Sequence, residues 1–546
     1  MDRFNQILEK TAGHVWGIPL IVLLVGTGIL LSILLKLVQI RKFPLSVRII
    51  SGKYDDPNEE GEVSHFRALT SALSATVGLG NIAGVAVAIS LGGPGALFWM
   101  WLTASVGMAI KYSTCLLALK YRTIHADGTV SGGPMFTIVK GLGPRWKPLA
   151  VAFSLFTITA SFGMANMFQA NQMANALREG FSIPTWLTGI VLVVLVSLVI
   201  VGGIKRIGAV TSMLVPFMCL LYIIGGLAVL AARASAVPEA IRLIFTAAFT
   251  GVEPAAGGFA GIAVWTTLQQ GVRRGTFSHE SGLGSAPIAH AAAKTREPVR
   301  EGLVAMMEPF IDTILICSMT ALVIVVTGTW RMGDAPRVRG EEMTRIAADS
   351  RPASEGPTVV EGRKASGRTV AWAGEVVDVR IFPFKHQIVV KVGDGMHQTF
   401  FAESPPELNW AGQVAAGDHV LIKGKIEGKV DGAAITSFAF GSVLGWVGIY
   451  VVIAAVVLFA VSTTISWSYY GDRCADFLFG EKGIKTYRII FAGVLFIGSV
   501  HKLEAVVNFA DICNGLMAIP NLIATLALLP VILGETRDYF RRYPHP

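Results

Sequence analysis

Apolar stretches of roughly the length needed to cross a lipid bilayer recur along this chain, and this constrains the fold more than any other feature. A spanning helix needs about 20 mostly apolar residues. With 53% hydrophobic residues, 15% charged residues and a mean hydropathy of +0.58, the composition does not suit a soluble protein. We therefore expect an all-α polytopic membrane protein. Its spans are expected near residues 17–40, 66–91, 95–121, 149–176, 184–203, 207–232, 256–276, 300–328, 444–470, 486–500 and 505–533.

The positions of the basic residues predict the orientation in the membrane. Lys and Arg gather after the first, third, fifth, seventh, ninth and last spans, and the loops between are poorer in them. By the positive-inside rule the N-terminus lies outside and the C-terminus in the cytoplasm, in the plasma (inner) membrane. The first apolar run is too long for a signal peptide, so the first span is expected to stay. The formal net charge of +9 follows from these loops, and no nucleic acid is expected as a partner.

The five cysteines have no paired spacing, which favours packing roles over disulfides or a metal site. They are Cys115, Cys219, Cys317, Cys474 and Cys513.

If the leading span is set aside, the other ten divide into two groups of five with opposite orientation. Two such groups are expected for an inverted repeat. The first span of each group is predicted to be interrupted. In the first group the interruption is Gly78-Leu79-Gly80-Asn81, and in the second it is expected at or near Gln269-Gln270-Gly271. Backbone groups released inside a bilayer must face protein, water or a solute. The pair of interruptions therefore predicts a transporter binding site at membrane depth.

A polar region separates two parts of the transmembrane domain. We expect domain boundaries at 1–330, 331–432 and 433–546, with the middle segment extracytoplasmic. Its first part, to about Gly367, is a charged linker, and short alternating runs follow, bounded by Gly-Asp turns. This pattern predicts a small antiparallel β-barrel, of the oligonucleotide/oligosaccharide-binding (OB-like) type. The runs are residues 374–380, 387–392, 397–401 and 419–426.

The first interruption suits an amino acid and a cation together. N–H groups at the start of the resumed helix favour a carboxylate, and released carbonyl groups before it favour a dehydrated sodium ion. We assign the N–H groups of Leu79 and Gly80 to the carboxylate. The carbonyl groups from Ser74 to Val77, with the Asn81 side chain, are assigned to the ion.

Further polar residues within the spans extend this site. The hydroxyl cluster Ser462-Thr463-Thr464-Ile465-Ser466 offers hard oxygen ligands, and Gln169 is the amide of the fourth span expected to contact substrate. Ionisable residues in lipid are costly and usually paired or functional. Because Lys111 and Glu308 lie in equivalent spans of the two groups, we expect a structural ion pair between them.

Several long motifs resemble the alanine/glycine:cation symporters, also called sodium:alanine symporters. The resemblance covers nearly all of the chain outside residues 331–432. It is carried by TALSATVGLGNIAGVAVAISLGGPGALFWMWLTASVGMAIKYS, GTFSHESGLGSAPIAHAAAKT, MMEPFIDT, STTISW and MAIPNL. It implies a ten-helix inverted-repeat fold with one extra N-terminal helix, eleven spans in all.

The resemblance also implies sodium- or proton-driven uptake of alanine, glycine or a close relative, with sodium as coupling ion and no other cofactor. The family's substrate site falls on Thr76, Gly78, Gly80, Gln169 and the stretch Trp265 to Gly271, which includes Gln269 and Gln270, and its ion site on Thr463 with its neighbours. Many members have Thr where Leu79 stands, and the Gln269-Gln270 pair and the inserted barrel also depart from the family pattern.

Alternatives to a sodium symporter remain open at this point. A proton-coupled carrier is the nearest of them. Two others belong to different classes: an intramembrane enzyme using Glu308 and Asp312 as a carboxylate pair, and a sensor whose barrel reads a solute. Both acids fall on one helix, which is a poor geometry for groups that must flank a substrate.

Overall fold

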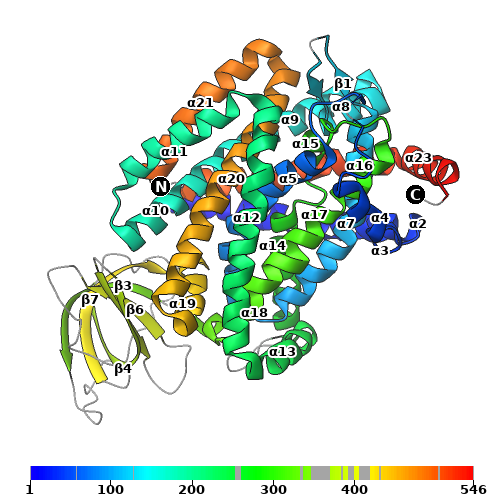
Figure 1. Ribbon diagram of the computed structural model, residues 1–546. Helices are drawn as coiled ribbons and strands as arrows, with labels where there is room; N and C mark the ends of the chain where they lie inside the picture. The colour runs from blue at the N-terminus through cyan, green and yellow to red at the C-terminus, as the bar shows by residue number, and fades with distance from the viewer. Residues whose placement is uncertain are drawn as a thin grey trace.

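A computed structural model of the chain is mostly helical, with a β-barrel at one end (Figure 1). The structure describes residues 2–56, 58–126, 128–251, 260–332, 336–345, 369–382, 385–391, 399–404, 419–429, 432–501 and 504–544. In the first half the helices are α1 (Asp2–Val15), α2 (Ile18–Leu34), α3 (Val38–Arg41), α4 (Phe43–Ile50), α5 (His65–Thr76), α6 (Val85–Gly92), α7 (Ala96–Lys120), α8 (Pro134–Thr137), α9 (Lys147–Phe162), α10 (Phe168–Phe181), α11 (Thr185–Ile200), α12 (Gly203–Ala232) and α13 (Val237–Thr250).

The second half continues the helical pattern after a short undescribed stretch. Its helices are α14 (Ala260–His279), α15 (Ala286–His290), α16 (Pro298–Ala305), α17 (Met307–Pro309), α18 (Ser318–Val326), α19 (Gly432–Leu444), α20 (Trp446–Phe479), α21 (Glu481–Val500), α22 (Glu504–Ala527) and α23 (Leu529–Arg542). Within the described residues, four π-helical turns interrupt the α-helical pattern, at Gly80–Gly84, Ile138–Leu142, Gly163–Met167 and Phe310–Cys317.

Eight helical stretches of the described residues are long and apolar enough to span a membrane, and nine if the bent pair α5 and α6 is counted as one span. The fifth and seventh predicted spans coincide with α11, which is short, and with α14, which lies outside this set. A helix therefore stands at each predicted position, while the total of eleven spans stays a prediction.

The first predicted interruption coincides with a sharp bend. α5 and the stretch from Gly80 to Gly92 meet at 53°. Ser64 caps the start of α5 by accepting a hydrogen bond from the N–H of Arg67. The helix ends at Thr76, where Val77 adopts an extended conformation, and it resumes as the π-helical turn Gly80–Gly84. Such turns occur often at functional sites.

The second interruption was predicted in the wrong place. α14 continues unbroken through Gln269, Gln270 and Gly271 and ends at His279. The chain then turns through residues 280–285, where Gly282 and Gly284 have φ of +92° and +93°, before α15 begins. Positive φ is the conformation that glycine adopts without strain. The interruption therefore lies just after α14.

Gly271 has a packing role instead. A Cβ atom there would lie 2.4 Å from the carbonyl oxygen of Ala96, and one at Gly275 would lie 2.6 Å from Thr103 Oγ1. The two glycines are four residues apart on α14 and both face α7. This is the small-residue spacing that lets membrane helices approach closely.

The polar insertion contains a closed five-stranded barrel. Its strands are β3 (Pro336–Arg345), β4 (Thr369–Phe382), β5 (Lys385–Lys391), β6 (Thr399–Ser404) and β7 (His419–Lys429), in the order β3-β6-β5-β4-β7. The four predicted runs correspond to β4 to β7. β3 lies in the stretch predicted as linker, and it pairs in parallel with β6, so the barrel is not wholly antiparallel as expected. The sequence PRVRGEEMTR has no strand-like alternation, and β3 instead pairs extensively with β7.

The two ends of the helical body carry different structures (Figure 1). The barrel, α19 and α13 lie at one end. The hairpin of β1 (Thr123–Ile124) and β2 (Val130–Ser131) lies at the other end, near α15. The loops predicted to be cytoplasmic are thus separated from the segment predicted to be extracytoplasmic. Which end faces which compartment stays a prediction.

The packing of α14 on α7 can be tested with Gly271→Ala. The added methyl group meets backbone, so we expect a loss of about 1–3 kcal/mol and a lower melting temperature in detergent. Gly493→Ala on α21 is the matched control, because nothing lies within 4 Å of a Cβ atom there. Equal melting temperatures for the two variants would contradict the packing role.

Candidate functional site

The interruption after α5 contains a backbone donor that is satisfied locally. The N–H group of Gly78 donates to Asn81 Oδ1 at 2.8 Å. Leu79 and Asn81 are fully buried, so this stretch is shielded within the protein. A Cβ atom at Gly80 would lie 3.5 Å from the ring of Phe277, which places the end of α14 against the interruption. The two interrupted spans therefore meet here.

α20 packs against the same interruption and places Ser462 and Thr463 beside Ser74 and Gly78. Ser74 Oγ donates to the carbonyl oxygen of Ser462 at 2.7 Å, and Ser462 Oγ lies 3.4 Å from the carbonyl oxygen of Ser74. A Cβ atom at Gly78 would lie 2.5 Å from Thr463 Oγ1, so a larger residue there would require the Thr463 side chain to move. Two segments nearly four hundred residues apart thus form one polar contact.

Two hydroxyl groups of the predicted cluster on α20 have no partner in the described part of the chain. Among the described residues, Thr463 Oγ1 and Ser466 Oγ are buried and make no hydrogen bond. Thr464 differs, since its hydroxyl donates to the carbonyl oxygen of Ala460 in the same helix. Leaving a buried hydroxyl unpaired costs about 1–3 kcal/mol. Hard oxygen atoms of this kind suit a dehydrated alkali cation.

A second polar cluster borders the interruption, and the sequence did not predict it as a site. Asp312, in the π-helical turn Phe310–Cys317, accepts hydrogen bonds from Asn81 Nδ2 at 2.6 Å and Ser278 Oγ at 2.8 Å. Thr313 Oγ1 donates to it at 2.7 Å. These donors are all neutral. The sequence indicated Asp312 only as one acid of the carboxylate pair in the enzyme alternative, and its contact with Asn81 depends on packing between helices.

The residues predicted to bind substrate lie on three separate elements: Thr76 ends α5, Gln169 begins α10, and the stretch from Trp265 to Gly271 belongs to α14. Gln169 lies just after the π-helical turn Gly163–Met167, and its Oε1 is buried without a partner among the described residues. The Thr76 hydroxyl lies 3.3 Å from the carbonyl oxygen of Leu73. Trp265 is 39% exposed. The stretch from Trp265 to Gly271 lies about 10 Å or more from Ser278 along α14, as the rise of 1.5 Å per residue requires.

Lys111 and Glu308, the residues for which an ion pair was predicted, lie 2.7 Å apart and are fully buried. Their pair belongs to a longer chain of contacts. The second Glu308 oxygen lies 2.7 Å from His290 Nε2, and His290 Nδ1 contacts Glu301, which also contacts His65 Nδ1. Glu308 and Asp312 therefore belong to separate networks, which does not suit a catalytic carboxylate pair.

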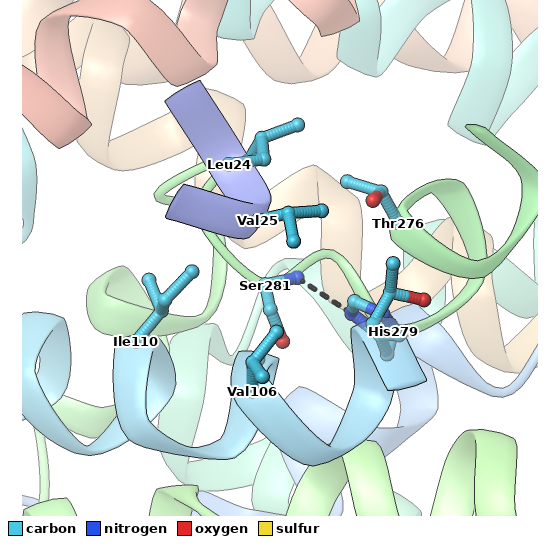
Figure 2. Close-up of a pocket in the computed structure, with 9 residues that line it drawn as sticks. Leu24, Val25, Val106, Ile110, Thr276, His279 and Ser281 are labelled. Atoms are coloured by element: carbon cyan, nitrogen blue, oxygen red, sulfur yellow. Dashed lines mark hydrogen bonds between the residues drawn. The ribbon is translucent and has the colours of Figure 1, made fainter. Parts of the chain in front are cut away.

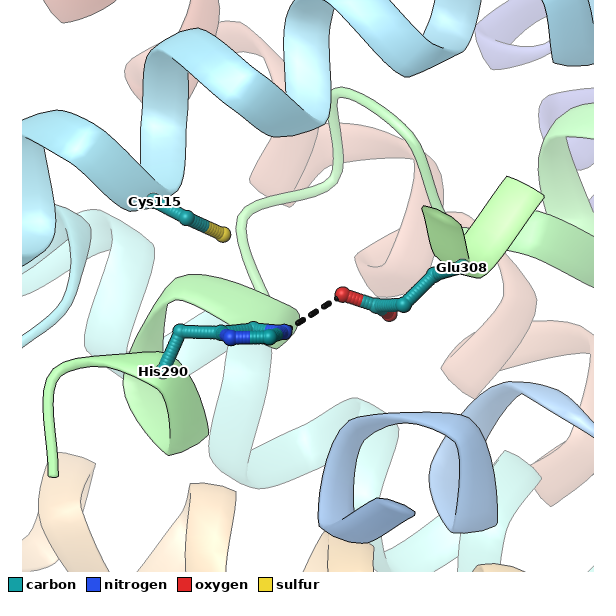
Figure 3. Close-up of side chains that lie close together, drawn as sticks. All are labelled: Cys115, His290 and Glu308. Atoms are coloured by element: carbon teal, nitrogen blue, oxygen red, sulfur yellow. Dashed lines mark hydrogen bonds and ion pairs between the residues drawn. The ribbon is translucent and has the colours of Figure 1, made fainter. Parts of the chain in front are cut away.

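Cys115 Sγ, a His290 nitrogen and a Glu308 oxygen lie within 4.8 Å of one another (Figure 3). Such a triad has the ligand types of a metal site. Both Glu308 oxygens and both ring nitrogens of His290 are already engaged in ion pairs. The residues therefore fit an ion-pair cluster better than a metal centre.

A small pocket lies between α2, α7 and the second interruption (Figure 2). The backbone N–H of Ser281 donates to His279 Nδ1 at 3.1 Å, so the other ring nitrogen carries the proton when the ring is neutral. His279 Nε2 and Ser281 Oγ are buried without partners among the described residues. Leu24 and Val25 of α2 form one wall, so the leading helix covers the turn after α14.

Comparison with known proteins identifies one family. The sequence profile of the sodium:alanine symporter family matches residues 1–361 and 415–545. The sodium/alanine symporter AgcS of Methanococcus maripaludis is 38% identical over 98% of this chain and 97% of its own length. An uncharacterized transporter of Haemophilus influenzae is 39% identical over 98% of this chain and 96% of its own length. A probable sodium/glutamine symporter of Bacillus subtilis, GlnT, is 30% identical over 98% of this chain and 92% of its own length.

Removing one member of the buried ion pair tests its structural role. Lys111→Met leaves Glu308 with His290 alone, and we expect a loss of about 3–5 kcal/mol in thermal unfolding of the detergent-purified protein. Lys111→Met with Glu308→Gln should recover part of this loss. Lys120→Met is the control, since the Lys120 and Glu535 side chains remain partly exposed and such pairs contribute about 0–1 kcal/mol.

Exchange of the two charges of this pair is a further test. A lysine at position 308 would face His290, so exchanging the two charges should not restore stability. Equal unfolding of Lys111→Met and Lys120→Met would contradict the structural role of the buried pair.

Proposed function

Because this chain belongs to the sodium:alanine symporter family, we propose that it is a secondary active transporter that couples sodium entry to uptake of alanine or glycine. The observation that carries the proposal is the contact between the interrupted α5 and α20. There, the buried Thr463 hydroxyl group, which has no partner among the described residues, lies against Gly78, and the likewise unpartnered Ser466 hydroxyl group follows three residues later on α20. This set of oxygen atoms fits a sodium ion, with ligands from Ser74, Val77, Thr463 and Ser466, and with Thr464 and Asn81 at its border.

Coupling follows from the shared location of the ion and the substrate. A sodium ion between α5 and α20 would hold the two helices together and order the interruption. The N–H groups of Leu79 and Gly80 then present a fixed site for a carboxylate. Sodium would raise the affinity for the amino acid, and the amino acid would raise the affinity for sodium by the same factor.

The proposal also includes a small side chain on the substrate. Buried Leu79 and the Phe277 ring beside Gly80 limit the space at the interruption, which favours a small side chain. The glutamine symporter named above is a more distant relative at 30% identity. Inhibition of labelled-alanine uptake into proteoliposomes by unlabelled glycine, alanine and glutamine would rank the affinities of the transporter for these three amino acids.

We also propose the five-plus-five inverted repeat, with α2 as the extra helix. The two interrupted spans, α5 with α6 and α14 with α15, would be the first helices of the two repeats. Their contact at Gly80 and Phe277 supports this arrangement. The proposed orientation has the N-terminus and the barrel outside and the C-terminus in the cytoplasm, as the basic loops indicate.

The barrel is proposed to be an OB-like accessory module. Three strands in chain order, β4, β5 and β6, pair antiparallel, and β3 and β7 close the barrel between β6 and β4. Residues 362–414, outside the matched parts of the family profile, lie within the polar insertion. An accessory role predicts that transport continues when the insertion is removed.

Thr463→Val tests the proposed sodium site. The valine keeps the shape of threonine and removes the unpartnered hydroxyl, so we expect the sodium concentration for half-maximal alanine uptake to rise about tenfold or more. Thr525→Val on α22 is the matched control, because that hydroxyl donates to the carbonyl oxygen of Asn521 in its own helix. Uptake of labelled alanine is measured in proteoliposomes under a sodium gradient. Uptake that follows a pH gradient and ignores sodium would overturn the proposal.

A further inference from the structure

Two buried acids beside the interruptions have no basic partner. Asp312 lies in the π-helical turn Phe310–Cys317 and is fully buried, and Glu280, in the turn after α14, is 5% exposed. Within the described residues, no ion pair joins either acid to a basic side chain. A lone charge at membrane depth is costly, and such residues are usually paired or functional.

The basic groups nearby do not balance these two acids. The ion-pair cluster next to them holds two acids and three basic side chains, which are Glu301, Glu308, Lys111, His290 and His65. Even with both of these histidines charged, three positive groups face four carboxylates once Asp312 and Glu280 are included. His279 adds no charge, since its Nδ1 accepts a hydrogen bond from the N–H of Ser281. At least one carboxylate therefore lacks a compensating cation within this region.

The surroundings of Glu280 do not suit a bound cation. Its carboxylate accepts hydrogen bonds from Trp467 Nε1, at 3.0 Å, and from the Ser285 hydroxyl group. An indole N–H is a donor only and has no lone pair for a cation. Ser285 is the one oxygen donor among these two neighbours. Glu280 thus has the partners of a carboxylate that fixes the turn after α14 against α20.

The surroundings of Asp312 are richer in oxygen. Ser278 Oγ and Thr313 Oγ1 lie 2.8 Å and 2.7 Å from the same carboxylate oxygen, Asp312 Oδ2. A hydroxyl group can rotate to turn its lone pairs toward a cation. Carboxylate and hydroxyl oxygen atoms are the hard ligands that suit an alkali cation. Three side chains from the end of α14 and the π-helical turn therefore converge as ligands.

Hydrogen-bond acceptors also outnumber protons at this place. Asn81 Oδ1 accepts from the N–H of Gly78, which directs Nδ2 toward Asp312. This nitrogen carries two protons, yet four acceptors lie within 3.3 Å of it. They are Asp312 Oδ1, the Asp312 carbonyl oxygen, Ser278 Oγ and Cys317 Sγ. The amide cannot serve all four, so a cation would satisfy acceptors that its protons do not reach.

We propose that Asp312 binds a second coupling sodium ion, with the hydroxyl groups of Ser278 and Thr313 as further ligands. The inference rests on the proposed function, because the chain is taken to be a sodium-coupled transporter. This site is separate from the one at Thr463, since none of its ligands comes from α20. Asn81 links it to the first interruption and Ser278 links it to the second. Sodium at Asp312 therefore holds the two interruptions together.

The number of sodium ions bound by the purified full chain tests the second site. The melting temperature in detergent is followed as sodium replaces choline at constant ionic strength, without alanine. Above its dissociation constant, each bound ion adds stability in proportion to the logarithm of the sodium concentration. Asp312→Asn keeps the shape of the side chain and removes its charge, so the rise per tenfold sodium should fall to about half of the wild-type value. Asp538→Asn, at an exposed acid of α23, is the matched control and should keep the wild-type rise.

The outcomes separate this inference from the proposed function. Equal rises in wild type and Asp312→Asn would overturn the second site, because asparagine resembles a carboxyl group that already holds a proton. A wild-type melting temperature that is the same in sodium and in choline would count against the proposed function itself.

Transport gives an independent test that does not depend on the folding of Asp312→Asn. Fluxes of labelled sodium and labelled alanine into proteoliposomes should stand in a ratio of two to one for wild type. Ser278→Ala keeps the Asp312 charge and removes one ligand, so the sodium concentration for half-maximal uptake should rise about tenfold. A wild-type ratio of one, or an unchanged sodium dependence in Ser278→Ala, would overturn the inference.

Discussion

The contact between Gly78 and Thr463 is the constraint on which the rest of the site depends. A helix interrupted at membrane depth is stable only when its released backbone groups find partners. Asn81 satisfies the N–H of Gly78, and the absence of a side chain at Gly78 lets α20 approach with its hydroxyl groups. A larger residue at position 78 would separate α5 from α20, and the proposed cation ligands would no longer converge.

Buried polar groups surround this contact on two sides. Asp312, Asn81 and Ser278 join the interruption to α14 and to the π-helical turn at Phe310–Cys317. Asp312 is held by neutral donors, whereas Glu301 and Glu308 are balanced by His290 and Lys111. The difference in partners separates the polar network at the interruption from the ion-pair cluster that joins the neighbouring helices.

Much of the architecture follows from the sequence, because local composition determines where an apolar helix can form. The first interruption was predicted correctly, since glycines and Asn81 stand together inside an apolar segment. The second was not, because Gly271 serves close packing against Ala96 while the true turn needs Gly282 and Gly284 at positive φ. Strand β3 and the contact of Asn81 with Asp312 were also missed. Both depend on pairing between distant segments, which local patterns do not encode.

The linkage between sodium and alanine binding at the purified protein is the most direct test of the account. If the interruption after α5 is the shared site, the affinity for alanine rises as sodium replaces choline at constant ionic strength. The affinity for sodium then rises by the same factor when alanine is present. An alanine affinity that is the same in sodium and in choline would contradict the account.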